Sequence, residues 1–253
     1  MLAQKPADKL HLELAIYQAI RQAACHSIST DLLDLQARRR QLPLGQLLNK
    51  GASPKISLNA AAGALIQIND TRLQSLQREG YQVIKLKVGI ADPAAELNLL
   101  LCVSKQLKPS TLLRLDANQA WDFRQAVYFI DAVQGMPVES LEEPLQEPTL
   151  AKLEKLQSRS SIPLAMDESI TGMTRHVLIQ AGVIRRLVLK PRVLGGLKPA
   201  MDIAMQAHQA GMDCVVTSLL ESAAGIWACS HLAAAIDPLF PGLAHGLVTS
   251  QWL

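Results

Sequence analysis

Acidic residues end several short apolar segments of this chain, and their type suits chemistry next to a metal ion. Asp116, Glu142 and Asp167 each end such a segment, 26 and 25 residues apart. Three carboxylates brought together without a cation would repel one another. A hard divalent cation removes this repulsion, and a set of oxygen ligands without His or Cys favours Mg²⁺ over Zn²⁺. We therefore predict that Asp116, Glu142 and Asp167 bind Mg²⁺.

Lysines end the apolar segments on either side of these acids. Lys85 and Lys87 end the segment before Asp116, and Lys190 ends the segment after Asp167. If the segments are neighbouring strands, Lys87 and Lys190 face each other across the metal. A lysine close to other cations has a lowered pKa and can act as a base near neutral pH. The set predicts removal of a proton next to a carboxylate, with the metal stabilising the enediolate that forms.

The elements that must position these side chains alternate between short apolar segments and amphipathic stretches. Strict alternation of strand and helix is typical of a parallel sheet with right-handed crossovers. Eight repeats close into a TIM-like (β/α)₈ α/β barrel, whose active site lies at the C-terminal ends of the strands. An open doubly wound sheet is the alternative, but it usually carries a glycine-rich turn after its first strand, and Gly63 alone does not supply one. The expected strands are residues 56–62, 83–88, 112–116, 138–142, 163–167, 187–190, 214–218 and 243–247.

Helix signals separate these strands and also precede them. Asp92, Asp122 and Thr149 are expected N-caps for helices over 94–107, 123–133 and 150–157, and further helices are expected over 73–79 and 198–210. Residues 8–48 predict two helical segments, the second of which stops before Pro43. We expect residues 1–54 to form one unit and residues 55–253 the barrel.

The composition excludes several classes of protein. Of the 253 residues 49% are hydrophobic and 19% charged, which rules out intrinsic disorder. The net charge of +3 is too small to indicate nucleic acid binding, and the basic run 38–40 is interpreted as a solvated helix end. No segment has the length of an apolar membrane span, and no signal peptide is evident. We expect a cytoplasmic enzyme with a small-molecule carboxylate substrate and with neither nucleic acid nor membrane as a partner. The sequence does not indicate an oligomeric state. The four scattered cysteines are expected to be small buried residues.

The order of the charged motifs resembles a known family. KxK at 85–87, DxN at 116–118, EEP at 142–144, DES at 167–169 and the lysine at 190 are similar to the enolase superfamily, in its muconate-cycloisomerase-like subgroup. The resemblance runs over residues 30–247. It implies a modified (β/α)₇β barrel preceded by an α+β capping domain, of which residues 1–54 show only the helical part. The strands and lid loop of that domain have no counterpart here, so we expect the lid that closes the site to be missing, lost or supplied by a partner.

Within the subgroup the chain is most similar to the o-succinylbenzoate synthases. The segments that carry this likeness are residues 33–38, 114–121, 141–144, 189–191, 195–196, 218–225 and 245–247. The resemblance implies Mg²⁺-dependent dehydration of 2-succinyl-6-hydroxy-2,4-cyclohexadiene-1-carboxylate to 2-succinylbenzoate, a step of menaquinone biosynthesis.

The resemblance also assigns roles to individual residues. Lys87 would take the α proton and then help to expel the hydroxyl group as water, while Lys190 would stay cationic and stabilise the enolate. The groups that would orient Lys87 and the metal ligands are Lys85, Arg114 and Asn118. The groups that would contact the succinyl arm are Ser218, Gly195 and Gly196.

Alternatives remain for the activity and for single residues. A dipeptide epimerase or an N-succinylamino acid racemase would use the same two lysines. Epimerases typically place Asp-x-Asp near the eighth strand, whereas residues 245–250 read HGLVTS. A second alternative is an inactive barrel that serves as an interaction module. Among single residues, Arg114 could pair with a nearby carboxylate, Gly195 and Gly196 could form a plain loop, Glu221 could cap a helix, and His245 could be a core residue.

Overall fold

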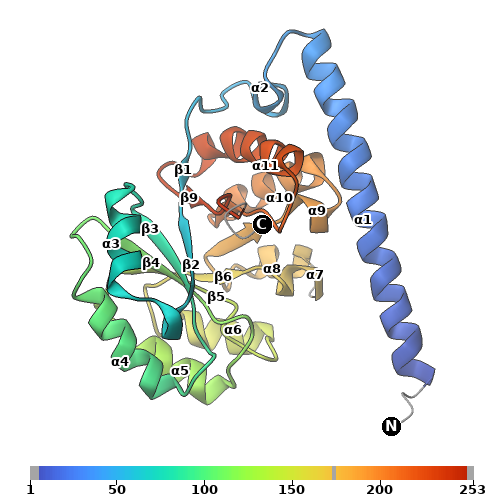
Figure 1. Ribbon diagram of the computed structural model, residues 1–253. Coiled ribbons are helices and arrows are strands. Elements are labelled where there is room, and N and C mark those ends of the chain that lie inside the picture. The colour runs from blue at the N-terminus through green and yellow to red at the C-terminus, as the bar shows by residue number, and fades with distance from the viewer. Residues whose placement is uncertain (1–5, 173–174, 250–253) are drawn as a thin grey trace.

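The strands of the computed structural model form a parallel sheet that curves into a barrel (Figure 1). The model describes residues 6–172 and 175–249, with the side chains of 16–170 and 175–249. Seven strands pair in sequence order, each parallel to the next. They are β2 (Ala60–Ala64), β3 (Val83–Lys87), β4 (Leu112–Asp116), β5 (Val138–Glu142), β6 (Leu164–Met166), β7 (Arg186–Leu189) and β8 (Asp213–Val216).

Strands β1 and β9 close the barrel. Strand β1 (Ser57–Leu58), which directly precedes β2, pairs in parallel with β9 (Ala244–His245). On its other side β9 meets β8, since Gly246 N donates to the Val216 carbonyl at 2.9 Å. Because β1 and β2 belong to one stretch of chain, the sheet returns to its first strand. The predicted TIM-like α/β barrel is confirmed, with every predicted strand present.

Helices follow the strands and cover the outside of the barrel. The predicted caps are confirmed, because Asp92, Asp122 and Thr149 each accept a backbone N–H at the start of the helix that follows. The helices after the strands are α3 (Asp70–Arg78), α4 (Pro93–Ser104), α5 (Phe123–Ala132), α6 (Leu150–Gln157), α7 (Ser169–Gly172), α8 (Arg175–Ala181), α9 (Pro191–Leu194), α10 (Leu197–Gln209) and α11 (Ala223–Ile236), with 3₁₀ turns η1 (Leu65–Gln67) and η2 (Asp237–Leu239).

The N-terminal segment forms one long helix where two were predicted. Helix α1 (Pro6–Arg39) runs without a break, since residues 21–31 contain neither Gly nor Pro, and it stands along one side of the barrel (Figure 1). It contacts α9 and α10, while the short α2 (Leu44–Leu48) packs on α11. Two hydrogen bonds fix α2 there: Gly45 N donates to His231 Nδ1 at 3.1 Å, and Asn49 Nδ2 donates to the Ala235 carbonyl at 2.7 Å.

The surface departs from the sequence prediction at two cysteines. Cys214 and Cys229 are buried as expected, but Cys25 on α1 and Cys102 on α4 are exposed. The prediction was wrong for these two because each lies on the outward face of its helix.

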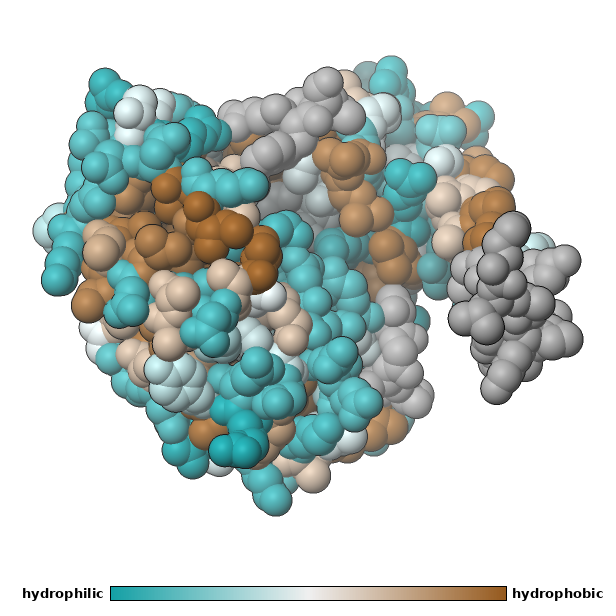
Figure 2. All heavy atoms as spheres, turned by 60° about the horizontal axis from the view of Figure 1, so that its bottom comes forward, coloured by the Kyte–Doolittle hydropathy of each residue, from teal (hydrophilic) through white to brown (hydrophobic). Residues whose placement is uncertain are grey.

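Figure 2 shows one face of the molecule, which is mostly hydrophilic and carries one gathered hydrophobic patch. Among the described residues, no helix has the length and apolar character needed to span a bilayer.

Candidate active site

A cavity of about 530 Å³ opens at the C-terminal ends of the strands. Lys85 and Lys87 enter it from β3, and Lys190 enters it from the end of β7. Ser218, which follows β8, and Thr249, which follows β9, also line it with their hydroxyl groups. Sequence reasoning placed the lysines at one end of the barrel, and the structure brings all three into one cavity. The acids Asp116 and Asp167 line the same cavity.

Strand register brings Asp116 and Glu142 together under Lys85. Asp116 is directly opposite Glu142 in the β4–β5 pair, and Lys85 projects from the neighbouring strand β3. Lys85 Nζ lies 2.9 Å from Asp116 Oδ2 and 2.8 Å from both carboxylate oxygens of Glu142. Burial opposes the charge on Lys85, but Glu142 and Asp116 outweigh it and raise the pKa of this lysine. Lys85 was predicted to orient both Lys87 and the metal ligands. In the structure it forms ion pairs with two of the predicted ligands, Asp116 and Glu142.

Asp167 extends this chain of charges to Lys190. The Lys190 ammonium forms an ion pair with Asp167, and Asp167 also shares a hydrogen bond with Glu142. Burial and the negative charge of Glu142 raise the pKa of Asp167 to about 8. The three predicted ligands thus lie in one row, in which Lys85 pairs with Asp116 and Glu142 and Lys190 pairs with Asp167.

Lys87 differs from the other two lysines in its surroundings. Its Nζ lies 2.6 Å from Asn118 Oδ1, and it makes no ion pair with any described residue. Asn118 itself is held by a hydrogen bond from its backbone N–H to Asp116 Oδ1 at 3.0 Å. The predicted link between Asn118 and Lys87 is present, so the amide aims this lysine into the cavity.

Glu143 shapes the loop that presents Asp167. Its Oε1 accepts hydrogen bonds from the backbone N–H groups of Asp167 and Ser169 at 2.6 and 2.8 Å, and its Oε2 accepts one from the Ser169 hydroxyl. Left-handed backbone is uncommon outside glycine and concentrates at functional sites. In the described chain, four residues other than glycine have a left-handed backbone. Three of them follow the strands that carry the acids: Asn118 and Gln119 come after β4, and Glu143 comes after β5.

Arg114 points away from the cavity, into the barrel interior. It donates to Glu139 at 3.0 and 3.1 Å, to Asn59 Oδ1 and to the Ala244 carbonyl, and Glu139 also pairs with Arg186. Burial alone would raise the pKa of Glu139, but Arg114 and Arg186 outweigh it and lower that pKa to about 2. The alternative in which Arg114 pairs with a nearby carboxylate is confirmed. Sequence reasoning missed Glu139, whose only signal was a charge inside an apolar strand.

The remaining predicted residues divide between the cavity and its surroundings. Ser218 Oγ lies 2.7 Å from Thr249 Oγ1 on the cavity wall. Gly195 and Gly196 join α9 to α10. Gly196 lies against α1, because a side chain there would collide with Ser29, whereas a Cβ at Gly195 would meet no atom within 4 Å. Their contact with substrate stays a prediction.

His245 is a core residue, as one alternative stated. Its Nδ1 accepts a hydrogen bond from Val216 N at 3.0 Å, and burial lowers its pKa to about 4. The alternative in which Glu221 caps the next helix is wrong, because Ser222 is the N-cap of α11 and accepts a hydrogen bond from Gly225 N. Glu221 instead accepts one from Leu219 N in the preceding loop.

The donor set fits a hard divalent cation. Asp116, Glu142 and Asp167 are buried carboxylates, and ammonium groups already supply positive charge to each of them. As they stand, no three acidic, His or Cys side chains within the described residues converge closely enough to bind a metal ion. A bound cation would compete with Lys85 and Lys190 for these carboxylate oxygens, which their ammonium groups contact in this structure.

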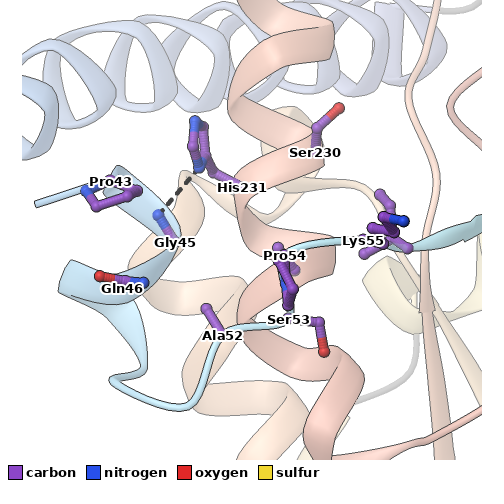
Figure 3. A pocket seen from close by; sticks show the side chains of 11 residues that line it. Pro43, Gly45, Gln46, Ala52, Ser53, Pro54, Lys55, Ser230 and His231 are labelled. Atoms are coloured by element: carbon purple, nitrogen blue, oxygen red, sulfur yellow. Dashed lines mark hydrogen bonds between the residues drawn. The ribbon is translucent and has the colours of Figure 1, made fainter.

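A second hollow lies at the opposite end of the barrel and carries no comparable chemistry. It measures about 370 Å³ and lies between the segment that leads into β1 and helix α11 (Figure 3). His231 points across it to the backbone of Gly45, and this hydrogen bond uses the imidazole Nδ1 as a structural acceptor (Figure 3). We interpret this hollow as part of the junction between α2 and the barrel.

The fold and the acid–lysine site define a class of barrel enzymes, and comparison with known proteins identifies the family. The family model "Enolase C-terminal domain-like" matches residues 70–245. This chain belongs to that family, within the enolase superfamily.

Named relatives include both epimerases and a synthase. The L-Ala-D/L-Glu epimerase of Bacillus subtilis is 32% identical over 160 residues, which is 62% of this chain and 44% of that protein. The o-succinylbenzoate synthase of Yersinia pestis is 32% identical over 168 residues, which is 65% of this chain and 51% of that protein.

Solved structures agree in fold. The substrate-liganded Bacillus subtilis epimerase superposes with a TM-score of 0.81 at 26% identity, covering 92% of this chain and 65% of that one. The dipeptide epimerase of Enterococcus faecalis gives 0.80 at 27% identity, covering 96% and 70%. The chain spans about 44–65% of the length of these epimerases and other curated relatives that it matches.

Proposed function

We propose that this chain catalyses Mg²⁺-assisted removal of the α proton of a small carboxylate, with o-succinylbenzoate synthesis as the first candidate reaction. The observation that carries this proposal is the cavity in which Lys87 and Lys190 flank the acids Asp116 and Asp167. A lysine on either side of a row of carboxylates is suited to proton transfer at a carbon held between them.

The residues take distinct parts in the proposed reaction. Asp116, Glu142 and Asp167 would hold Mg²⁺, whose positive charge would stabilise the negative oxygen that forms when the α proton leaves. Lys87, which its hydrogen bond to Asn118 aims into the cavity, takes that proton on Nζ. It then returns the proton to the departing hydroxyl group, so that the C–O bond breaks, water leaves and the ring becomes aromatic. Lys190 remains an ammonium that attracts the enolate.

The part of the cavity wall that follows β8 and β9 bears on the choice of substrate. Ser218 and Thr249 offer hydroxyl groups there, and in the described chain the β9 side of the cavity carries no carboxylate. Hydroxyl groups suit the carbonyl and carboxylate oxygens of a succinyl arm. They do not provide a counter-ion for an ammonium group, which favours the synthase reaction.

Dipeptide epimerisation is the second candidate. It is favoured by the similarity to the Bacillus subtilis and Enterococcus faecalis epimerases. In that reaction one lysine removes the α proton and the other returns a proton on the opposite face. Both candidates therefore share the same first step.

One pair of assays separates the candidates. With purified protein and Mg²⁺, we expect the ultraviolet absorbance of the cyclohexadiene carboxylate to be lost, and L-Ala-L-Glu to keep its α proton in D₂O by ¹H NMR. Lys87→Met should abolish the absorbance change, whereas Lys152→Met, on the outside of α6, should not. Deuterium uptake by the dipeptide without turnover of the cyclohexadiene would replace the first candidate with the second. Absence of both would contradict the proposed proton abstraction.

A further inference from the structure

A separate cavity of about 610 Å³ lies between helix α1 and the loops that follow β7 and β8. Its walls include His26 and Thr30 of α1, Arg192 of α9, and Glu221 just before α11. Leu220 borders both this cavity and the catalytic one, so the two are neighbours across a single residue. No role in the proposed reaction falls on any of its polar side chains.

Buried hydrogen-bonding atoms in this cavity lack partners in the protein. His26 is 5% exposed, and its Nδ1 meets no hydrogen-bonding atom of the described chain. Thr30 Oγ1, one helical turn further along α1, is also buried without a partner. Buried polar atoms are nearly always satisfied, and each orphan costs free energy. Two of them in one cavity indicate a place for a hydrogen-bonding ligand.

The charges of the cavity indicate which ligand fits. Glu221 is 8% exposed, and no Lys, Arg or His of the described chain forms an ion pair with it. Asp31 adds a second carboxylate at the exposed edge, and Arg192 adds one guanidinium there. Burial lowers the pKa of His26, with Glu221 opposing this effect, so the imidazole is neutral at pH 7 and offers a lone pair. Two carboxylates against one guanidinium attract a ligand that carries a positive group.

We propose that this cavity binds a small zwitterion with a primary ammonium group, such as an amino acid or a short peptide. The ammonium has three N–H donors, which match the Glu221 carboxylate, the His26 imidazole and the Thr30 hydroxyl. The carboxylate of the ligand would lie at the edge, beside Arg192. The volume is ample for a dipeptide. This site is independent of the proposed reaction, because none of its residues is assigned to the proton transfer.

Two matched peptides test the proposal by isothermal titration calorimetry on the whole chain. Glycylglycine carries the ammonium, and N-acetylglycylglycine lacks it. We expect saturable binding of glycylglycine alone. Glu221→Gln should weaken it at least tenfold, because the glutamine keeps an oxygen for Leu219 N but removes the charge. Glu154→Gln, at an exposed carboxylate of α6, is the matched control and should leave binding unchanged.

Further arms identify the source of the ammonium and guard against unfolding. If the ligand is the end of a substrate that extends from the catalytic cavity, Lys190→Met also weakens binding; if it is a free zwitterion, only the Glu221 variant does. The NMR signals of the His26 ring should shift with glycylglycine, and Thr30→Val should reduce affinity if the Glu221 variant does not fold. Equal binding of both peptides, binding unaffected by Glu221→Gln or Thr30→Val, or no binding at all would overturn the proposal.

Discussion

Replacing Lys85 should expose how strongly the buried acids depend on a cation. Its ammonium lies 2.8–2.9 Å from oxygens of both Asp116 and Glu142. Those carboxylates are only 2% and 1% exposed, so water cannot take over the role of the ammonium. Removing one partner of a buried ion pair typically costs about 3–5 kcal/mol. We expect Lys85→Met to lower the free energy of unfolding by about that amount in EDTA, since methionine matches the chain length without the charge.

Magnesium should reverse much of this loss. A ligand that binds only the folded state at a hundred times its Kd stabilises by about 2.7 kcal/mol. In the variant Mg²⁺ meets carboxylates with no competing ammonium at Lys85, whereas in the wild type it must displace one. The gain in stability on adding Mg²⁺ should therefore be larger for Lys85→Met than for the wild type.

Urea unfolding followed by circular dichroism, with EDTA or with Mg²⁺, measures both effects. Lys152→Met is the control, because Lys152 makes an exposed contact with Glu147 at 3.7 Å and should change stability by less than about 1 kcal/mol. The reasoning is refuted if Lys85→Met costs no more than the control in EDTA. It is also refuted if Mg²⁺ stabilises Lys85→Met and the wild type by the same amount.

The remaining predictions concern activity, pH and backbone. Lys87→Met and Lys190→Met should each lower kcat at least about 100-fold, because proton transfer is lost, while circular dichroism stays unchanged. Near-normal turnover by either variant would remove that lysine from the mechanism. Mg²⁺ affinity, measured by calorimetry, should rise with pH up to about 8, because the raised pKa of Asp167 means that binding must release a proton; a flat profile from pH 6 to 8 would contradict this. Glu139 has a folded-state pKa of about 2 against the ordinary 4.5, so its ion pairs should contribute about 3 kcal/mol to the free energy of unfolding. This contribution should be complete above pH 4.5 and disappear as the pH falls toward 2. Acid unfolding of Glu139→Gln that parallels that of the wild type would disprove this. Gly89→Ala should destabilise, since φ is +79° and the new Cβ would lie 2.4 Å from the Ala120 Cβ; a thermal midpoint equal to that of the wild type would contradict the packing.

Much of the fold could be predicted because each strand and helix carries its own local signals. Asp122 predicted a cap from one residue, and the structure shows the reciprocal hydrogen bonds with Gln125. The strand ends also placed Lys87, Asp116 and Lys190 correctly at one mouth, because parallel strands bring their C-terminal ends together. The continuity of α1 was missed, since tertiary contact with α9 and α10 extends a weakly patterned helix.

Side-chain partners were harder to predict than positions. Lys85 shares the face of Lys87, yet it lies two residues earlier on β3, and from there its ammonium contacts Asp116 and Glu142. Arg114 turns to Glu139, although Ser140 is its register partner, because a register shift after Leu113 leaves Glu139 without a partner position on β4. Sequence alternation shows which face a residue occupies, but the choice among several charged neighbours on that face depends on distances that only the folded barrel fixes.

The most direct test of the central claim is a crystal structure with Mn²⁺ in place of Mg²⁺, read by anomalous scattering. We predict one anomalous peak bound by oxygens of Asp116, Glu142 and Asp167, with Lys85 displaced and Lys87 and Lys190 on opposite flanks. A peak elsewhere, or saturating Mn²⁺ with the lysine ion pairs intact and no peak at these acids, would contradict the account.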